Sequence, residues 1–126
     1  MKRTILLIDD NAVQAATRQA ILRGAGHLVE TASDPGDALQ RMQSGGFADV
    51  ALVITDHVMP VMNGSEFVRG LRKIHPQVPV MVISGLDEAE AEYEGLNVHF
   101  SVKPLHPDNL LAGVRDLLET RRRGAA

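Results

Sequence analysis

The chain has 126 residues, of which 44% are hydrophobic and 23% are charged, a size and balance that fit one compact soluble domain. It contains no cysteine, which excludes disulfides, thiolate nucleophiles and cysteine-ligated metal centres. The net charge of -3 and the aromatic content of 3% argue against a surface for nucleic acid or anionic lipid. No apolar run is long enough for a signal peptide or a membrane span, so we expect a cytoplasmic protein.

Runs of branched aliphatic residues predict five strands along the chain. They lie at Thr4–Ile8, Leu28–Thr31, Val50–Thr55, Val78–Ser84 and Val98–Val102. The first, third and fourth runs lack polar alternation, which is typical of parallel strands that are covered on both faces.

Helical periodicity separates or follows these strands. The helical stripes run from Val13 to Ile21, from Pro35 to Met42, from Gly64 to Ile74 and from Pro107 to Thr120. The apolar stripe of the first helix is formed by Val13, Ala16, Ala20 and Ile21. The segment that begins at Asp87 has few apolar anchors, and we expect only a short or mobile helix there.

The alternation of strands and helices predicts an α/β fold with one parallel sheet and helices on both faces. We expect a single domain over residues 1–120. The remaining residues, 121–126, contain three consecutive arginines and are interpreted as a basic tail or linker stub.

Charged and polar residues gather where the predicted strands end. Asp9 and Asp10 follow the first strand, Asp56 follows the third, Ser84 ends the fourth and Lys103 follows the fifth. Ligands of open parallel sheets bind at this edge. Two carboxylates about 4 Å apart repel by roughly 4 kcal/mol at an effective dielectric constant near 20, so the cluster needs a cation or a raised pKa. An oxygen-only ligand set favours Mg²⁺, with Mn²⁺ as the alternative.

Several enzyme classes are disfavoured by the same residues. The loop after the first strand, Asp9–Ala12, is acidic and does not suit the phosphates of a nucleotide or flavin. The chain has no GxxxxGK[ST] and no GxSxG pattern, so neither a P-loop nor a nucleophile elbow is supported.

The combined motifs resemble those of response-regulator receiver domains of two-component signalling. They are Asp9–Asp10, Asp56 within the segment Ile54–Gly64, Ser84–Gly85 and Lys103–Pro104. The resemblance covers residues 4–120. It implies a flavodoxin-like (βα)5 fold with a five-stranded sheet in the order 2-1-3-4-5.

The resemblance also implies a role for each acidic residue. Asp56 would be the phosphoacceptor and a metal ligand. Asp10 would be a direct Mg²⁺ ligand, and Asp9 a water-mediated or second carboxylate. The backbone carbonyl of Val58 would complete the protein ligands.

Three further residues take roles from the same resemblance. Ser84 would hydrogen-bond the phosphoryl oxygens, and Lys103 would neutralise one of them, so that Asp56, Ser84 and Lys103 form the reacting set. Ser84 and Phe100 would form the switch, with Phe100 as the aromatic residue that turns inward. The peptide bond between Lys103 and Pro104 would be cis.

The function implied is that of a signalling domain, not of an enzyme beyond its own phosphoryl transfer and dephosphorylation. The phosphodonor would be a histidine kinase or a histidine phosphotransfer protein. The face built by the fourth helix, the fifth strand and the fifth helix would contact an unknown output protein or domain, or a second copy in a homodimer. We expect no direct contact with nucleic acid or membrane.

Two departures from the family pattern bear on this interpretation. The interval from Ser84 to Lys103 is shorter than in most receivers. By resemblance, such shortening occurs in receivers of hybrid histidine kinases and in some stand-alone regulators, and the hybrid-kinase context is preferred. Val58 and Leu86 are apolar where many receivers place polar residues that guide hydrolytic water, which predicts slow autodephosphorylation.

Alternative interpretations remain for the fold and for single residues. A pseudo-receiver would keep the fold and act as an interaction module without phosphorylation. A Mg²⁺-dependent phosphohydrolase would need an Asp-x-Asp arrangement and a cap insertion, which the chain lacks. The histidines at 57, 75, 99 and 106 show no ligand spacing, and we interpret them as surface or edge residues.

Overall fold

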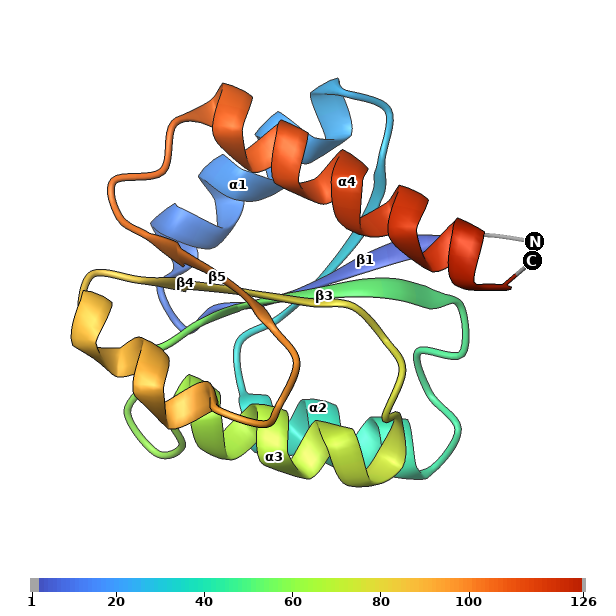
Figure 1. The fold of residues 1–126 in the computed structure, drawn as a ribbon, viewed down its shortest axis with the longest axis vertical. Helices are drawn as coiled ribbons and strands as arrows, with labels where there is room; N and C mark the ends of the chain where they lie inside the picture. Colours follow the sequence, from blue (N-terminus) through green and yellow to red (C-terminus); the bar gives the residue numbers. More distant parts are fainter. Residues whose placement is uncertain (1–2, 126) are drawn as a thin grey trace.

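The structure, a computed structural model, describes residues 3–125, and strands and helices alternate along them (Figure 1). The strands are β1 (Thr4–Ile8), β2 (Leu28–Ala32), β3 (Val50–Asp56), β4 (Val80–Ser84) and β5 (His99–Val102). The helices are α1 (Ala12–Gly24), α2 (Pro35–Gln43), α3 (Gly64–Ile74) and α4 (Pro107–Ala125), and a 3-10 helix, η1 (Asp87–Tyr93), lies between β4 and β5. All five predicted strands are therefore confirmed, with ends that differ by two residues or fewer.

The strands form one parallel sheet in the order β2-β1-β3-β4-β5, which confirms the predicted flavodoxin-like fold. The register brings the strand ends together. Ile8 of β1 is paired with Thr55 of β3, so Asp9 and Asp56 each lie one residue further along neighbouring strands. Asp56 is in turn paired with Ile83 of β4, which places the following residue, Ser84, at the same edge.

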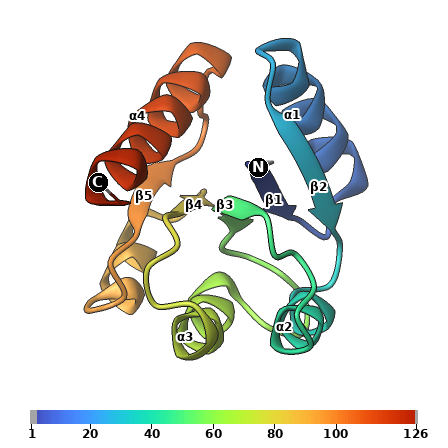
Figure 2. The same cartoon turned by 90° about the vertical axis from the view of Figure 1, so that its right-hand side faces the viewer.

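Helices cover both faces of the sheet (Figure 2). On one face, α1 and α4 cover a core of buried side chains that includes Leu22 and Val114. On the other face, α2, α3 and η1 cover a second core built around Phe67 and Leu71. All residues of β1, β3 and β4 are buried, as expected for strands that carry apolar residues on both faces.

Two helices begin at caps that the sequence indicates. The Asp34 side chain accepts a hydrogen bond from the Asp37 amide at the start of α2. At the start of α3, Asn63 and Glu66 form a reciprocal capping box. Each cap is worth about 1 kcal/mol, and the second one begins α3 directly after the loop that follows β3.

The predicted apolar stripe of α1 is wrong at three of its four positions, whereas Ile21 packs against the core as predicted. Val13 is 78% exposed, and the Ala16 and Ala20 side chains are exposed as well. The helix is rotated so that Gln14 and Arg18 turn towards the carboxyl edge of the sheet, where they bind carboxylates. Small apolar residues lose little by exposure, and in this rotation Leu22 is buried in the core while Gln14 and Arg18 gain charge-assisted hydrogen bonds.

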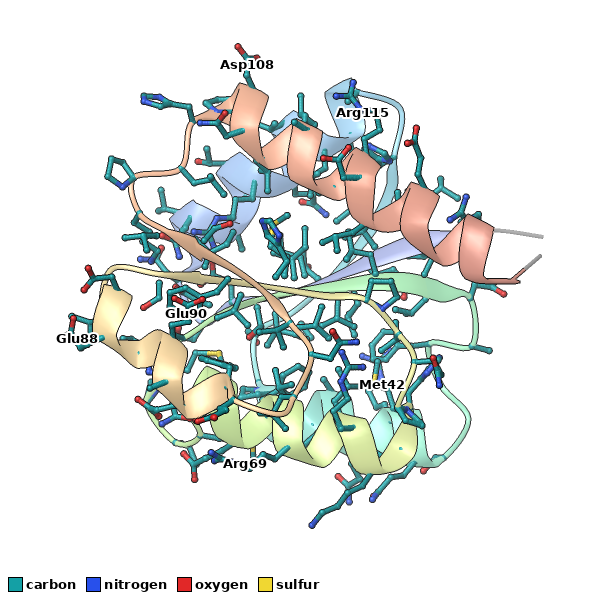
Figure 3. The ribbon with its side chains drawn as sticks, in the orientation of Figure 1. Met42, Arg69, Glu88, Glu90, Asp108 and Arg115 are labelled. Atoms are coloured by element: carbon teal, nitrogen blue, oxygen red, sulfur yellow. The ribbon has the colours of Figure 1, made fainter. Side chains whose placement is uncertain are left out.

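The segment between β4 and β5 contains no α-helix, and arginines of α3 hold it in place. Arg69 donates to the backbone oxygen of Glu92 at 3.0 Å, on the side of α3 that lies next to η1 (Figure 3). Arg72 donates to the carbonyls of Leu96 and Asn97 at 2.8 and 2.9 Å. Burial lowers the pKa of the Arg72 guanidinium. The short helix predicted here is present as η1, and it is attached to α3.

The last helix is longer than the sequence indicates. Its stripe predicts an end at Thr120, but α4 continues to Ala125, so the described part of the predicted basic tail extends the helix. Residues 1–2 and 126 of the predicted domain and tail lie outside the described residues. Within the described chain, none of the helices has the length and apolar character needed to cross a bilayer.

Candidate functional site

The predicted site residues lie at the carboxyl edge of the sheet and differ widely in exposure. Asp9 and Asp56 are 2% and 5% exposed, and Ser84 is fully buried. Asp10 is exposed and Lys103 is half-buried. The edge therefore holds two buried carboxylates with a third one, Asp10, at the surface.

Asp56 accepts hydrogen bonds on both of its carboxylate oxygens. The Lys103 ammonium lies 3.1 Å from Oδ1 and 3.1 Å from Oδ2. The His57 amide donates to Oδ1 at 3.1 Å, and the Gln14 side-chain amide donates to Oδ2 at 2.8 Å. The structure thus brings together the predicted phosphoacceptor and the predicted lysine.

Asp9 is held by three nitrogen donors. The Asn11 amide donates to Oδ1 at 3.0 Å. Oδ2 accepts from the Gln14 amide at 2.8 Å and from the Arg18 guanidinium at 3.2 Å. Burial lowers the pKa of Arg18, while the charges of Asp56 and Asp9 act in the opposite direction. The repulsion expected between neighbouring carboxylates is therefore offset by cations of the protein itself.

The remaining oxygen atoms of the edge suit a hard divalent ion. Within the described part of the chain, the Asp10 carboxylate and the Val58 carbonyl oxygen make no hydrogen bond. Together with Asp56 they form a donor set of carboxylate and carbonyl oxygens, which is the chemistry that Mg²⁺ prefers. The oxygens of both Asp9 and Asp56 already accept from nitrogen donors, so a metal at either carboxylate would share the oxygen with these donors or displace them. Among the described residues, no three His, Cys, Asp or Glu side chains converge as a metal centre.

The predicted switch residues, Ser84 and Phe100, have their observed partners elsewhere than at Asp56. The Ser84 hydroxyl donates to the carbonyl of Leu86 at 3.0 Å and accepts from its amide at 2.9 Å, so its hydrogen-bonding capacity is used within the turn after β4. Phe100 is half-buried and its ring lies 5.7 Å from that of Tyr93. The bond between Lys103 and Pro104 is cis, as predicted.

Comparison with known proteins decides the family. The profile of the response regulator receiver domain matches residues 5–115, and these residues include every site residue described above. The chain belongs to the response regulator receiver family.

Relatives of this receiver occur as parts of longer proteins. It is 30% identical to the transcriptional regulatory protein ZraR of Escherichia coli over 90% of its own length and 26% of that protein. It is 32% identical to the sensor kinase CckA of Brucella abortus over 92% of its own length and 12% of that kinase. The receiver therefore spans about a quarter or less of these two curated relatives.

Solved structures of receivers share its fold over nearly the whole chain. The CheY-like receiver of Methanospirillum hungatei superimposes with a TM-score of 0.89 at 23% identity, covering 98% of this chain and 99% of that one. A receiver from Sinorhizobium medicae gives a TM-score of 0.84 at 29% identity, covering 95% and 97%. The 3-10 helix between β4 and β5 is thus accommodated within the common receiver fold.

A buried network begins directly after Asp56 and was not expected from the sequence. His57, interpreted above as a surface or edge residue, is 5% exposed, so that interpretation is wrong. Its Nδ1 lies 2.6 Å from the Tyr93 hydroxyl, and its Nε2 lies 3.5 Å from a carboxylate oxygen of Glu92. Burial raises the pKa of Tyr93, and the charges of Glu92 and Asp56 act in the same direction. The network joins the loop after β3 of the receiver to η1.

Gly64 makes this network sterically feasible. A side chain at position 64 would meet the Tyr93 hydroxyl, and its Cβ would lie 2.8 Å from the backbone oxygen of Asp56. The Gly64 amide also donates to the His57 carbonyl at 2.8 Å. The glycine therefore allows α3, the end of β3 and η1 of the receiver to approach closely.

Four residues of the site were missed by sequence reasoning, namely Gln14, Arg18, His57 and Tyr93. A signal exists for the first two: they are four residues apart in a helix that begins just after Asp9, and such residues share one face. For His57 and Tyr93 the sequence carries no comparable signal, because their contact joins residues 36 positions apart.

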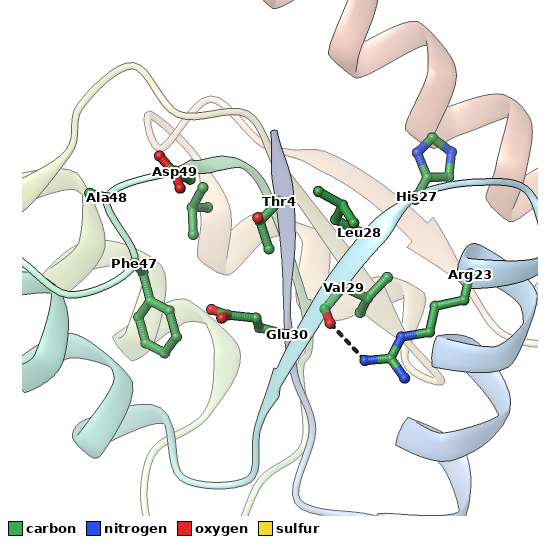
Figure 4. Close-up of a pocket in the computed structure, with 10 residues that line it drawn as sticks. Thr4, Arg23, His27, Leu28, Val29, Glu30, Phe47, Ala48 and Asp49 are labelled. Carbon is green, nitrogen blue, oxygen red and sulfur yellow. Dashed lines mark hydrogen bonds between the residues drawn. The ribbon is translucent and has the colours of Figure 1, made fainter. Parts of the chain in front are cut away.

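A hollow of about 560 Å³ lies at the opposite, amino edge of the sheet (Figure 4). Thr4, Glu30 and Asp49 line it, and the Arg23 guanidinium, on its wall, donates to the Val29 carbonyl at 3.1 Å. None of the predicted site residues lines this hollow, so it is separate from the cluster at the carboxyl edge.

Proposed function

We propose that this receiver accepts a phosphoryl group on Asp56 from a histidine kinase or a histidine phosphotransfer protein, with Mg²⁺ as cofactor. The observation that carries the proposal is the position of Asp56. It ends a buried strand and contacts an ammonium, Lys103, through both carboxylate oxygens. A nucleophile and a cation for the transferred charge are thus held at one point.

The proposed step is an in-line displacement at phosphorus. A carboxylate oxygen of Asp56 forms a bond to phosphorus while the bond from phosphorus to the donor's histidine nitrogen breaks, and the nitrogen keeps the electron pair. The peripheral oxygens carry negative charge in the transition state. Lys103 offsets this charge from the side on which it already contacts Asp56.

Residues of the loops would hold the cofactor. The oxygens of the required type come from Asp10, Asp56 and the Val58 carbonyl. Asp9 would hold the surrounding loop through its hydrogen bonds to Asn11 and Gln14. When bound, Mg²⁺ supplies positive charge that stabilises the transferring phosphoryl group and orients its oxygens.

Exposed apolar side chains support a protein as the phosphodonor. Val13, Val58, Val61 and Leu86 are 78%, 62%, 95% and 46% exposed. They lie on the first turn of α1 and on the loops after β3 and β4, the segments that follow the strand ends at the reacting edge. Apolar residues gathered around a polar centre are typical of protein contact sites.

The output of the proposed switch concerns the face formed by η1, β5 and α4. Phosphorylation adds charge and acceptor oxygens next to Ser84. If the Ser84 hydroxyl leaves Leu86 to bind them, the turn after β4 changes and Phe100 repacks. We propose that an output protein, an attached domain or a second copy binds this face. The similarity to the kinase CckA supports a hybrid-kinase context.

One observation favours the alternative of a pseudo-receiver. The Gln14 amide donates to both Asp9 and Asp56 at 2.8 Å, and Arg18 adds a positive charge at Asp9. The buried carboxylates are therefore neutralised without a metal, as a receiver that signals without phosphate would require. Asp10 and Lys103, which this role does not need, favour the phosphorylatable receiver.

Intact-mass spectrometry tests the proposal. The protein is incubated with Mg²⁺ and a small acyl-phosphate donor, and in parallel with a phosphorylated histidine phosphotransfer domain. We expect the addition of one phosphoryl group, and we expect the Asp56→Asn variant to show none. Asp49→Asn is the matched control, because Asp49 lies at the opposite edge of the sheet. No addition from either donor would favour the pseudo-receiver, and equal addition in Asp56→Asn would place the phosphoryl group on another residue and refute the role of Asp56.

A further inference from the structure

Arg18 is an unexpected cation at the reacting edge. It lies on α1, its side chain is 11% exposed and its guanidinium is 3.2 Å from Asp9 Oδ2, on a carboxylate that is fully buried. The roles proposed above for Asp56, Lys103 and the loop oxygens do not require it. Its burial against Asp9 therefore needs an explanation of its own.

Gln14 connects this cation to the phosphoacceptor. Its side-chain nitrogen donates to the same Asp9 oxygen that Arg18 contacts, and also to Asp56 Oδ2. The two residues stand four positions apart on the face of α1 that turns to the sheet edge. Arg18, Asp9, Gln14 and Asp56 thus form one continuous chain of charge-assisted hydrogen bonds.

The charges of the edge can be counted. Asp9, Asp10 and Asp56 contribute three negative charges, while Lys103 and Arg18 contribute two positive ones. The residual charge is -1 with Arg18 present and would be -2 without it. Since a divalent cation binds more tightly to a more negative site, Arg18 works against its binding.

We propose that Arg18 is a positioning residue that acts as a resident cation: it holds Asp9 and the Gln14 amide in place and lowers the affinity of the edge for divalent metal. This inference rests on the proposed Mg²⁺ site of Asp10, Asp56 and the Val58 carbonyl. It explains how two buried carboxylates are stable side by side in the absence of metal. It also makes metal occupancy of this receiver dependent on Mg²⁺ concentration.

Isothermal titration calorimetry of the metal-free protein with MgCl₂ tests the inference. We expect Arg18→Met to bind Mg²⁺ about tenfold more tightly than the original protein, the order of effect for one charge in a partly buried site. Arg18→Gln, which keeps a donor for Asp9 but removes the charge, should show the same direction. Arg18→Lys restores the charge and should return the affinity to within about twofold of the original.

Arg23→Met is the matched control, because it removes the same charge from the same helix. Arg23 is exposed and lines the hollow at the amino edge of the sheet, opposite the proposed metal site. Its removal should leave the Mg²⁺ affinity unchanged at an ionic strength near 0.1 M, where separated surface charges are screened.

The possible results separate the two proposals. Equal or weaker Mg²⁺ binding by Arg18→Met and Arg18→Gln, with clear binding by the original protein, overturns the role of Arg18 and leaves the proposed function intact. Mg²⁺ binding by Arg18→Met and Arg18→Gln, with none by the original protein, supports the role of Arg18. No Mg²⁺ binding by any of the proteins overturns the metal site of the proposed function, and this inference with it.

Discussion

Replacing Tyr93 with phenylalanine tests the buried contact between η1 and the loop after the phosphoacceptor. The change removes one oxygen, the partner of His57 Nδ1 at 2.6 Å. The ring itself can stay in place, since it is 3% exposed and packs against Phe100 at 5.7 Å between centroids. The effect of the substitution is therefore confined to the hydrogen bond.

The expected loss of stability follows from the burial of both partners. His57 is 5% exposed, so in Tyr93→Phe its Nδ1 remains in the protein interior without a partner. Leaving a buried polar atom unsatisfied costs about 1–3 kcal/mol. For a domain of this size we expect a fall in melting temperature of about 3–5 °C per kcal/mol. Urea unfolding followed by circular dichroism measures the free energy directly.

A double-mutant cycle shows whether the lost oxygen acts through His57. In a His57→Leu background the hydroxyl has already lost its partner, so Tyr93→Phe should cost little there or even stabilise the protein. We expect a coupling free energy of about 1 kcal/mol or more. The same cost of Tyr93→Phe in both backgrounds, or a cost below about 0.5 kcal/mol in the original one, would refute the reasoning.

Three further predictions concern single positions near the same edge. The folded-state pKa of Tyr93 is raised above the ordinary value of about 10, so the folded protein keeps the phenolic proton at a pH where the unfolded chain loses it. The stability that this difference contributes is fully present below the ordinary pKa and is lost as the pH rises above it. Tyrosinate absorbance should therefore appear together with alkaline unfolding, and its appearance in the folded protein near the ordinary pKa would contradict the prediction. Gly64→Ala should destabilise by about 1–3 kcal/mol through overpacking against the Tyr93 hydroxyl, whereas Gly24→Ala, with nothing within 4 Å of its added Cβ, should cost nothing in the same urea titration. Polar replacements at the exposed positions Val58 and Leu86, as Val58→Asn and Leu86→Glu, should change the phosphoaspartate lifetime measured by loss of phosphoryl mass, and an unchanged lifetime in both variants would remove the rationale for slow autodephosphorylation.

The positions of the strands, and the polar residues at their carboxyl ends, could be predicted because burial restricts which residues a strand can contain. A parallel strand covered on both faces must be apolar along its length, and the change to Asp9 or Asp56 marks where it leaves the core. The first residues of α2 and α3, Pro35 and Gly64, could also be predicted, because the residues that cap these helices lie next to them in the sequence. These features depend on residues within a few positions of one another.

The rotation of α1 could not be predicted from hydrophobic periodicity. Ala16 and Ala20 fit either side of the helix at little cost, so they carry weak information about which side is buried. The observed rotation buries Leu22 and brings Gln14 and Arg18 to the sheet edge, where their partners Asp9 and Asp56 belong to two different strand ends. Only the register of the sheet brings those partners together.

The position of His57 illustrates the same limit in a different way. A histidine that follows a buried strand can point to solvent or to the core with almost equal ease. In the structure it points inward and contacts Tyr93 of η1, a segment that Arg69 of α3 also contacts. The contact joins residues 36 positions apart, so the local pattern of the sequence does not determine it.

Asp56 is the point where the two unexpected networks meet. Its Oδ2 is bound by Gln14, which leads to Arg18 on α1, and its Oδ1 is bound by the His57 amide, whose side chain leads to Tyr93 in η1. The first helix covers one face of the sheet and η1 lies on the other. A phosphoryl group bonded to either oxygen would change the negative charge next to both donors, the Gln14 side chain and the His57 amide. A change at this single carboxylate would therefore act on elements of both faces, and the variants at Arg18 and Tyr93 separate the two effects.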